Sequence, residues 1–166
     1  INQLTDYVVS TGIQNVTLTG GEPLLQKNIG LLITALDSIG LNIEIETNGS
    51  VPLKNFTPFS ANTSITMDYK LPRSEMEQYM CLDNFSYLTE NDTVKFVVSD
   101  LKDLNRAKEI INTYNLTEKC RVYFSPVFGK INPDTIVSFM KEHTLNKIRL
   151  QLQLHKYIWD PNQRGV

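Results

Sequence analysis

The sequence predicts an α/β protein built on a mostly parallel sheet. Short apolar, strand-like runs alternate along the chain with segments in which apolar residues have helical spacing. This alternation is typical of a parallel sheet, either open or curled into a barrel. Polar, glycine and proline residues also gather directly after six of the expected strands. Because the carboxyl ends of parallel strands form the ligand-binding edge of such proteins, we expect a binding site there.

The first half of the chain supplies two helices and three strands of this pattern. Helical spacing of apolar residues covers residues 2–10 and 27–39. Apolar runs of strand length cover residues 16–19, 43–46 and 64–69. The chain therefore begins with a helix and then alternates as a parallel sheet requires.

The second half continues the alternation after one ambiguous stretch. Residues 75–88 have no clear period, and we expect them to be helical in their second half. A charged outer face indicates a helix over residues 104–114, and Asn132-Pro133-Asp134 is a suitable cap for a helix over 135–143. The remaining strands are expected at residues 93–98, 121–124 and 147–154.

Composition indicates a single domain, residues 1–166, that binds a small molecule. With 41% hydrophobic residues the chain can form a substantial core. A net charge of −2 without a basic run argues against nucleic acid or an anionic membrane as partner. No apolar stretch approaches the roughly 20 residues of a membrane span, and no signal peptide is visible. Cys81 and Cys120 fit no metal spacing, so we expect no metal site here and a reducing, cytoplasmic setting.

The most informative passage is Thr19-Gly20-Gly21-Glu22-Pro23, directly after the first expected strand. Two glycines let the backbone turn sharply and come close to a ligand. Pro23 fixes φ and suits a first helical turn. The Glu22 carboxylate either contacts a ligand or accepts backbone N–H bonds within its own loop, and the sequence favours neither.

Other strand ends leave similar alternatives open. Asn48-Gly49 is a common turn dipeptide as well as a candidate binding loop. Asp68 and Lys70 stand two residues apart on one strand face and could form a structural ion pair. His155, expected at the end of the last strand, is a lone histidine of the kind that is often only hydrogen-bonded.

Several passages resemble a known family. Gly20-Gly21-Glu22-Pro23 and Glu46-Thr47-Asn48-Gly49, each after a strand, resemble the radical S-adenosylmethionine (SAM) superfamily. Within it, the passages from Leu18 to Gln26, from Met67 to Pro72 and from Gln151 to Val166 are similar to the 7-carboxy-7-deazaguanine synthase family of the queuosine pathway. The ordered set covers essentially the whole chain.

The resemblance implies an enzyme, a carbon–nitrogen lyase that serves tRNA modification. In this family a [4Fe–4S] cluster cleaves SAM reductively, and the 5′-deoxyadenosyl radical abstracts hydrogen from 6-carboxy-5,6,7,8-tetrahydropterin. The ring then contracts with loss of ammonia to give 7-carboxy-7-deazaguanine, with Mg²⁺ assisting. A reductant such as flavodoxin and a homodimer are implied as well.

The resemblance also implies which residues form the site. The amino-acid end of SAM would lie on the backbone of Gly20, Gly21, Glu22 and Pro23, with Gly21 closest. The rest of the cofactor would contact Thr47, Asn48, Asp68, Tyr69, Lys70, Ser125, Pro126, Val127 and Phe128. The pterin would contact Thr19, His155 and the carboxylate of Val166.

The chain departs from the family in its cysteines. The family holds its cluster in a Cys-x3-Cys-x2-Cys-type loop, with the Mg²⁺ ligand after it, and this sequence has neither. We therefore expect an N-terminally truncated, incomplete β/α barrel of the radical SAM type without the first strand and cluster loop. Such a chain would have no catalytic residue of its own and an unpaired sheet edge. Two alternatives are another radical SAM enzyme, such as a glycyl-radical activase, and a non-catalytic SAM-binding protein.

Overall fold

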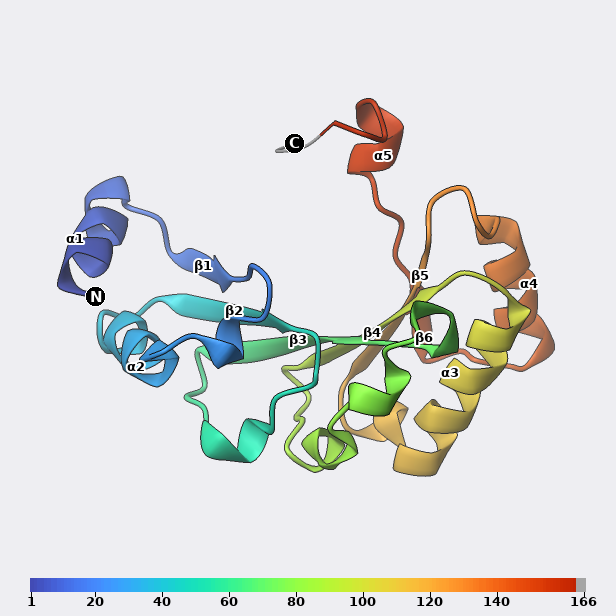
Figure 1. Ribbon diagram of the computed structural model, residues 1–166, viewed down its shortest axis with the longest axis horizontal. Coiled ribbons are helices and arrows are strands. Elements are labelled where there is room, and N and C mark those ends of the chain that lie inside the picture. Colours follow the sequence, from blue (N-terminus) through green and yellow to red (C-terminus); the bar gives the residue numbers. More distant parts are fainter. Residues whose placement is uncertain (164–166) are drawn as a thin grey trace.

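A computed structural model describes residues 1–163, which form one open sheet of six strands (Figure 1). All neighbouring strands are parallel and follow the order of the sequence. The strands are β1 (Asn15–Leu18), β2 (Asn42–Thr47), β3 (Thr63–Tyr69), β4 (Thr93–Val98), β5 (Arg121–Pro126) and β6 (Ile148–Leu150). The predicted α/β class and parallel sheet are confirmed, and the barrel is not closed. The predicted substrate contact at Val166 lies outside the described residues.

Four of the five α-helices accompany the sheet. They are α1 (Asn2–Thr11), α2 (Ile29–Ser38), α3 (Leu101–Tyr114) and α4 (Pro133–Glu142), and a short α5 (His155–Ile158) follows β6. Helix α2 packs on β2, α3 on β4, and α4 on β5 and β6. Figure 1 shows α5 at the end of an extended passage that leaves the sheet near β6. Among residues 1–163, no helix is long and apolar enough to cross a membrane.

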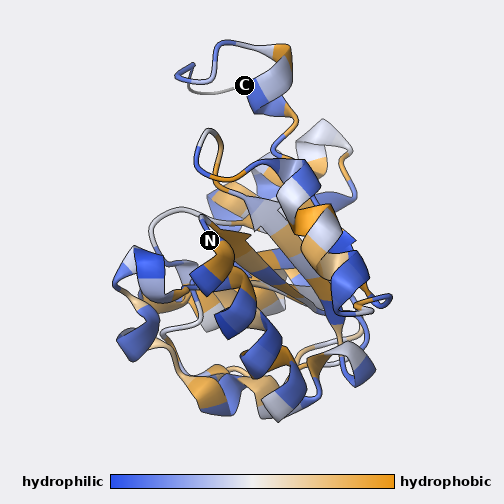
Figure 2. Ribbon diagram, turned by 90° about the vertical axis from the view of Figure 1, so that its right-hand side faces the viewer, coloured by the Kyte–Doolittle hydropathy of each residue, from blue (hydrophilic) through white to orange (hydrophobic). Residues whose placement is uncertain are grey.

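One face of the sheet forms the core. Burial alternates along β3 and β4, so every second side chain points under the helices. Leu36 of α2 and Leu104 of α3 are fully buried against this face. Figure 2 shows mainly hydrophobic colour on the central strands and both colours on the helices that cover them. The fully buried strand residues are Ile43, Ile45, Ile65, Met67, Tyr69, Val94, Phe96, Val98, Val122 and Phe124.

The opposite face of the sheet is polar. The residues between the buried ones include Glu44 and Glu46 on β2, Asp68 on β3, Lys95 on β4 and Tyr123 on β5. Strands of an all-parallel sheet are usually apolar on both faces because both faces are covered. A polar second face in such a sheet is consistent with a ligand-binding role.

The ambiguous stretch of residues 75–88 folds as short 3₁₀ helices, η4 (Glu77–Tyr79) and η5 (Leu82–Ser86), after η3 (Pro72–Ser74). Its second half is therefore helical as predicted, but as a 3₁₀ helix rather than an α-helix. Within η5, the side chain of the buried Asn84 bonds to distant backbone groups. Its Oδ1 accepts a hydrogen bond from Leu53 N at 2.8 Å, and its Nδ2 donates to Gly49 O at 3.1 Å and Val51 O at 2.9 Å.

Two further boundaries differ from the prediction. The last strand ends at Leu150 rather than at residue 154, so His155 is not at a strand end but opens α5. The alternation that predicted a longer strand continues through Gln151–Leu154, but there Gln151 N still bonds to Phe124 O while the chain leaves the sheet. Helix α3 begins three residues earlier than expected, because Asp100 caps it by accepting a hydrogen bond from Asp103 N at 3.0 Å.

Candidate active site

The turn after β1 is built around a buried carboxylate. Glu22 is 6% exposed and caps the 3₁₀ helix η1 (Pro23–Leu25), accepting a hydrogen bond from Leu24 N at 3.2 Å. Pro23 occupies the first position of η1, as its fixed φ predicts. The capped start of η1 thus fixes the C-terminal end of the turn. Gly20 and Gly21 lie between β1 and this cap.

Glu22 also joins this turn to the loop after β2. Its Oε1 accepts a hydrogen bond from Thr47 Oγ1 at 2.9 Å, and its Oε2 accepts one from Asn48 N at 2.7 Å. Of the two interpretations that the sequence left open, the structure shows the loop-fixing one. Protein donors occupy both oxygens of the carboxylate, so the ligand-binding capacity of this turn resides in its backbone.

Gly20 and Gly21 leave that backbone accessible. Both are exposed, and a Cβ placed on either would meet no other atom within 4 Å. Gly20 has a φ of +131°, a conformation that side chains rarely adopt. Within residues 1–163, neither glycine takes part in a loop hydrogen bond. Free backbone groups at an open turn fit the amino-acid end of SAM.

The loop after β2 is held from several sides. Thr47 Oγ1 accepts a hydrogen bond from Gly49 N at 3.1 Å, and Asn48 Oδ1 accepts one from Ser50 N at 2.9 Å. Gly49 has a φ of +75°, and a Cβ there would lie 2.6 Å from the Met80 side chain. The Asn-Gly pair therefore forms a turn packed against the core. Within residues 1–163 the Asn48 side-chain NH₂ has no hydrogen-bond partner, so it can donate to a ligand.

At the end of β3 the three predicted residues have different surroundings. Lys70 Nζ and Asp68 Oδ2 form an ion pair at 2.6 Å, which confirms the structural interpretation of that pair. The other oxygen, Asp68 Oδ1, is buried and has no hydrogen-bond partner within the described part of the chain. The ring of Tyr69 is 1% exposed, and its hydroxyl donates to Glu77 Oε1 at 3.0 Å. Burial and the nearby Glu77 carboxylate raise the pKa of Tyr69 well above its usual range. Because the ring is buried and its hydroxyl is bonded to Glu77, only the backbone of Tyr69 can contact a ligand.

Residues at the end of β5 and just after it line two small cavities at the same edge of the sheet. Ser125 and His155 line one of about 320 Å³ together with Lys95. Pro126 and Phe128 line the other, of about 220 Å³, where Phe128 meets Tyr157 edge-on with ring centroids 5.7 Å apart. The structure thus brings predicted residues from β5 and the C-terminal passage together, although they are about 30 positions apart in sequence.

Sequence reasoning missed the polar residues of the sheet face. Thr19, a predicted substrate contact, donates from Oγ1 to Glu46 Oε2 at 3.0 Å. Lys95 faces the cavity that holds Ser125. The sequence could have revealed this polar face, because residues 44, 46, 66, 68 and 95 alternate along their strands with the buried apolar residues. The predicted site residues lie at the ends of the expected strands or just after them, so residues in the middle of a strand were left out.

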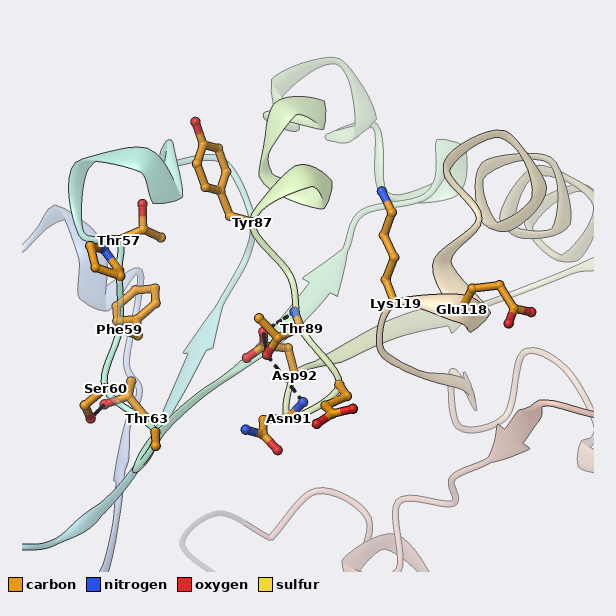
Figure 3. Close-up of a pocket in the computed structure, with 13 residues that line it drawn as sticks. Thr57, Phe59, Ser60, Thr63, Tyr87, Thr89, Asn91, Asp92, Glu118 and Lys119 are labelled. Carbon is orange, nitrogen blue, oxygen red and sulfur yellow. Dashed lines mark hydrogen bonds between the residues drawn. The ribbon is translucent and has the colours of Figure 1, made fainter.

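A larger cavity of about 890 Å³ lies at the opposite edge of the sheet (Figure 3). It is bordered by the segments that enter β3 and β4. Asp92 on its wall is structural, because its carboxylate accepts hydrogen bonds from Ile65 N at 2.7 Å and Thr89 N at 2.7 Å. The amino ends of parallel strands are the edge that stabilises such folds rather than the one that binds substrates. We therefore place the site at the carboxyl edge.

The cysteines do not fit an iron–sulfur cluster. Cys120 is buried at the start of β5, and burial raises the pKa of its thiol to about 11. That shift disfavours the thiolate that iron requires. Cys81, the other cysteine of the chain, lies in the turn before η5. Residues 1–163 contain no group of three or more His, Cys, Asp or Glu side chains that could hold a metal ion.

Comparison with solved structures identifies the class of fold. QueE from Escherichia coli aligns with 90% of this chain and 61% of its own length, with a TM-score of 0.64 at 21% identity. SuiB of Streptococcus suis bound to S-adenosylmethionine aligns with 89% of this chain and 40% of its own length, with a TM-score of 0.62 at 12% identity. The fold is that of the radical SAM enzymes.

Comparison with curated proteins identifies the family, although no family model matches the chain. The 7-carboxy-7-deazaguanine synthase of Clostridium acetobutylicum is 55% identical over 166 residues, covering 99% of this chain and 75% of that protein. The synthase of Chlorobaculum tepidum is 35% identical over 169 residues, covering 100% and 75%. This chain belongs to the 7-carboxy-7-deazaguanine synthase family.

Proposed function

We propose that this chain supplies the SAM-binding and pterin-binding residues of a 7-carboxy-7-deazaguanine synthase. The proposed reaction is the ring contraction of 6-carboxy-5,6,7,8-tetrahydropterin to 7-carboxy-7-deazaguanine with loss of ammonia, which makes the enzyme a carbon–nitrogen lyase. The observation that supports it best is the open Gly20-Gly21 turn, which Glu22 fixes to the next loop of the same sheet edge.

Different residues at this edge of the sheet would bind different parts of SAM. The backbone of Gly20 and Gly21 would hold its amino-acid end, because no side chain obstructs approach there. Asn48 and the backbone of residues 68–70 would bind along the nucleoside, with residues 125–128 completing that part of the site. SAM is the source of the radical that begins the reaction in this family, and the protein's part is to orient it and exclude water.

Thr19, Glu46 and His155 would contact the pterin. A pterin edge presents several donors and acceptors, which hydroxyl, carboxylate and imidazole groups can match. Thr19 and Glu46 are already joined by a hydrogen bond at 3.0 Å, so a pterin would meet them as one polar pair. Val166 belongs to the same proposal through the family resemblance.

The 166 residues by themselves are proposed not to hold the cluster. Two separate thiols, one of them buried and protonated, cannot replace a loop of three cysteines. We therefore derive no redox or Mg²⁺-dependent step for this chain. A flavodoxin-type reductant, a homodimer and a cytoplasmic location complete the proposal and depend on the family resemblance.

SAM binding by the chain tests the proposal directly. Equilibrium dialysis with radiolabelled SAM should show saturable binding that Gly21→Leu weakens about tenfold or more, because the new side chain would occupy the ligand's space. Gly30→Leu is the matched control, since a Cβ there also meets no atom within 4 Å. If the wild-type chain binds no SAM, or if both variants bind as well as it does, the proposed site is wrong.

A non-catalytic SAM-binding protein is the second candidate function. The unsuitable cysteines favour it, because such a protein would need no cluster. The two candidates differ in pterin binding, which only the synthase requires. A chain that binds SAM but no pterin would support this second candidate.

A further inference from the structure

A cavity of about 600 Å³ lies where the second half of α3 faces the loop that joins α4 to β6. Ile148, the first residue of β6, lines it, so the cavity lies at the amino end of that strand and away from the edge proposed to bind SAM. Three of its side chains are basic, Lys108, His143 and Lys147, and no aspartate or glutamate lines it. The cavity therefore has the charge of an anion-binding site.

Lys108 is a half-buried lysine without a carboxylate partner. Within residues 1–163 it forms no ion pair, whereas Lys147 at the same cavity pairs with Glu118 at 2.6 Å. The Lys108 ammonium group contacts His143 Nδ1 at 3.4 Å and lies 5.6 Å from the centroid of the Phe139 ring. Proteins seldom bury an ammonium group, with its three donors, unless it is paired. An anion that enters the cavity would supply the missing counter-charge.

Uncharged polar groups complete the lining of the cavity. They are the amides of Asn112 and Asn146 and the hydroxyls of Thr117 and Thr144. In the part of the chain that the structure describes, none of these four side chains forms a hydrogen bond with another residue. Each amide offers two N–H donors and each hydroxyl one. These donors are therefore available to a ligand with several acceptor oxygens.

Thr144 adopts a conformation that threonine rarely adopts, with a φ of +54°. It follows His143, the C-cap of α4, and Thr144 N donates to Lys141 O at 3.2 Å while Leu145 N donates to Met140 O at 2.9 Å. Helices that end in this way usually have glycine at the position of Thr144, because a β-branched residue is strained there. The helix end alone thus gives no reason for a threonine, whose hydroxyl lines the cavity.

We propose that this cavity binds a phosphate group, either as inorganic phosphate or as the phosphomonoester of a small molecule. Lys108 is the principal charged partner, because Lys147 is already paired. Lysine binds phosphate as a point charge, and a phosphomonoester carries about two negative charges and several acceptor oxygens near neutral pH. The basic and neutral donors of the cavity match that combination better than they match a singly charged carboxylate. The proposed site is independent of SAM and pterin binding.

Calorimetric titration of the chain tests the proposal with three probes: inorganic phosphate, ribose 5-phosphate and ribose. The ionic strength is kept constant with sodium chloride, because salt screens charge attraction. The variants are Lys108→Met, which removes the charge, and Lys108→Arg, which keeps it. Lys102→Met, at an exposed position of the same helix, is the matched control. Thermal unfolding without ligand shows that each variant is folded.

The wild-type chain should bind at least one of the two phosphate compounds and should not bind ribose. Lys108→Met should weaken that binding about tenfold, Lys108→Arg should retain most of it, and Lys102→Met should leave it unchanged. Tighter binding of ribose 5-phosphate than of inorganic phosphate identifies a phosphomonoester as the ligand. Binding of inorganic phosphate that is as tight or tighter identifies the free ion.

Thr144→Gly provides a second test, in which stability and binding should change in opposite directions. Relief of the backbone strain should raise the midpoint of thermal unfolding by about 2–4 °C, while loss of the hydroxyl should weaken phosphate binding about threefold or more. The proposal is wrong if the wild-type chain binds neither phosphate compound or binds ribose equally well. It is also wrong if Lys108→Met or Thr144→Gly binds phosphate as tightly as the wild type.

Discussion

Thr47 and Glu22 hold two loops of the sheet edge together: Thr47 Oγ1 donates to Glu22 Oε1 at 2.9 Å, and both residues are buried. One loop carries the glycine turn and the other carries Asn48. The bond therefore fixes the distance between the two parts of the proposed SAM site. It also explains why an acidic residue stands in the turn without facing the ligand.

Removing the Glu22 carboxylate should destabilise the chain. Glu22→Ala leaves Thr47 Oγ1 and the N–H groups of Leu24 and Asn48 without their acceptor, so we expect a loss of about 2–3 kcal/mol in the free energy of unfolding. Urea unfolding of this variant and of Glu90→Ala, at an exposed site, provides the comparison. Equal stability of the two variants would contradict the bridging role.

Gly49 should tolerate no side chain. Gly49→Ala places a Cβ 2.6 Å from Met80 Cε at a φ of +75°. Gly12→Ala is the control, because its φ is +69° but its Cβ would meet no atom within 4 Å. Both variants should lose about 1 kcal/mol through backbone strain, and Gly49→Ala should lose about 1–3 kcal/mol more through overpacking. Thermal unfolding measures the difference, and equal losses would show that the Met80 contact is unimportant.

The cap of α3 should make stability depend on pH. The hydrogen bond from Asp103 N, followed by that from the Arg73 guanidinium, lowers the pKa of Asp100 below its usual value. A carboxyl group with a lowered native pKa stabilises the fold above its unfolded pKa, and the effect disappears as the pH falls through the native pKa. Asp100→Asn keeps a capping side chain but removes this titration.

The stability difference between wild type and Asp100→Asn should therefore be greatest near about pH 7 and should shrink below about pH 4. Urea unfolding across that range measures it. A difference that stays constant from neutral to acidic pH would show that the Asp100 charge contributes nothing to folding.

Anaerobic reconstitution with iron and sulfide should leave the chain without a stoichiometric [4Fe–4S] cluster. Cys120 is buried with a pKa of about 11, and Cys81 alone cannot ligate a cluster. Iron analysis and the visible absorption spectrum measure the content. A full cluster that resists chelation would show that these two thiols, or other side chains, bind iron after all.

The sequence was informative where local pattern and tertiary structure agree. The alternation of strand-like and helical segments predicted the parallel sheet that the structure shows. It was uninformative where one side chain serves distant groups. The side chain of Asn84 bonds to backbone groups more than 30 positions away, which no local period can reveal.

The same limit applies to the site. Glu22 could be placed in the turn from its motif, but its partners Thr47 and Asn48 became evident only when β1 and β2 paired. Lys95 and residues 151–155 line one cavity, and the sequence did not predict where that segment leaves the sheet.

The side chain of Asn84 imposes an order on synthesis at the ribosome. It supports the backbone of Gly49, Val51 and Leu53, which emerge more than 30 residues earlier. A nascent chain that has emerged only as far as β3 therefore lacks the side chain that holds the loop with Asn48. The part of the proposed SAM site to which Asn48 belongs is complete only when the segment leading into β4 has left the exit tunnel.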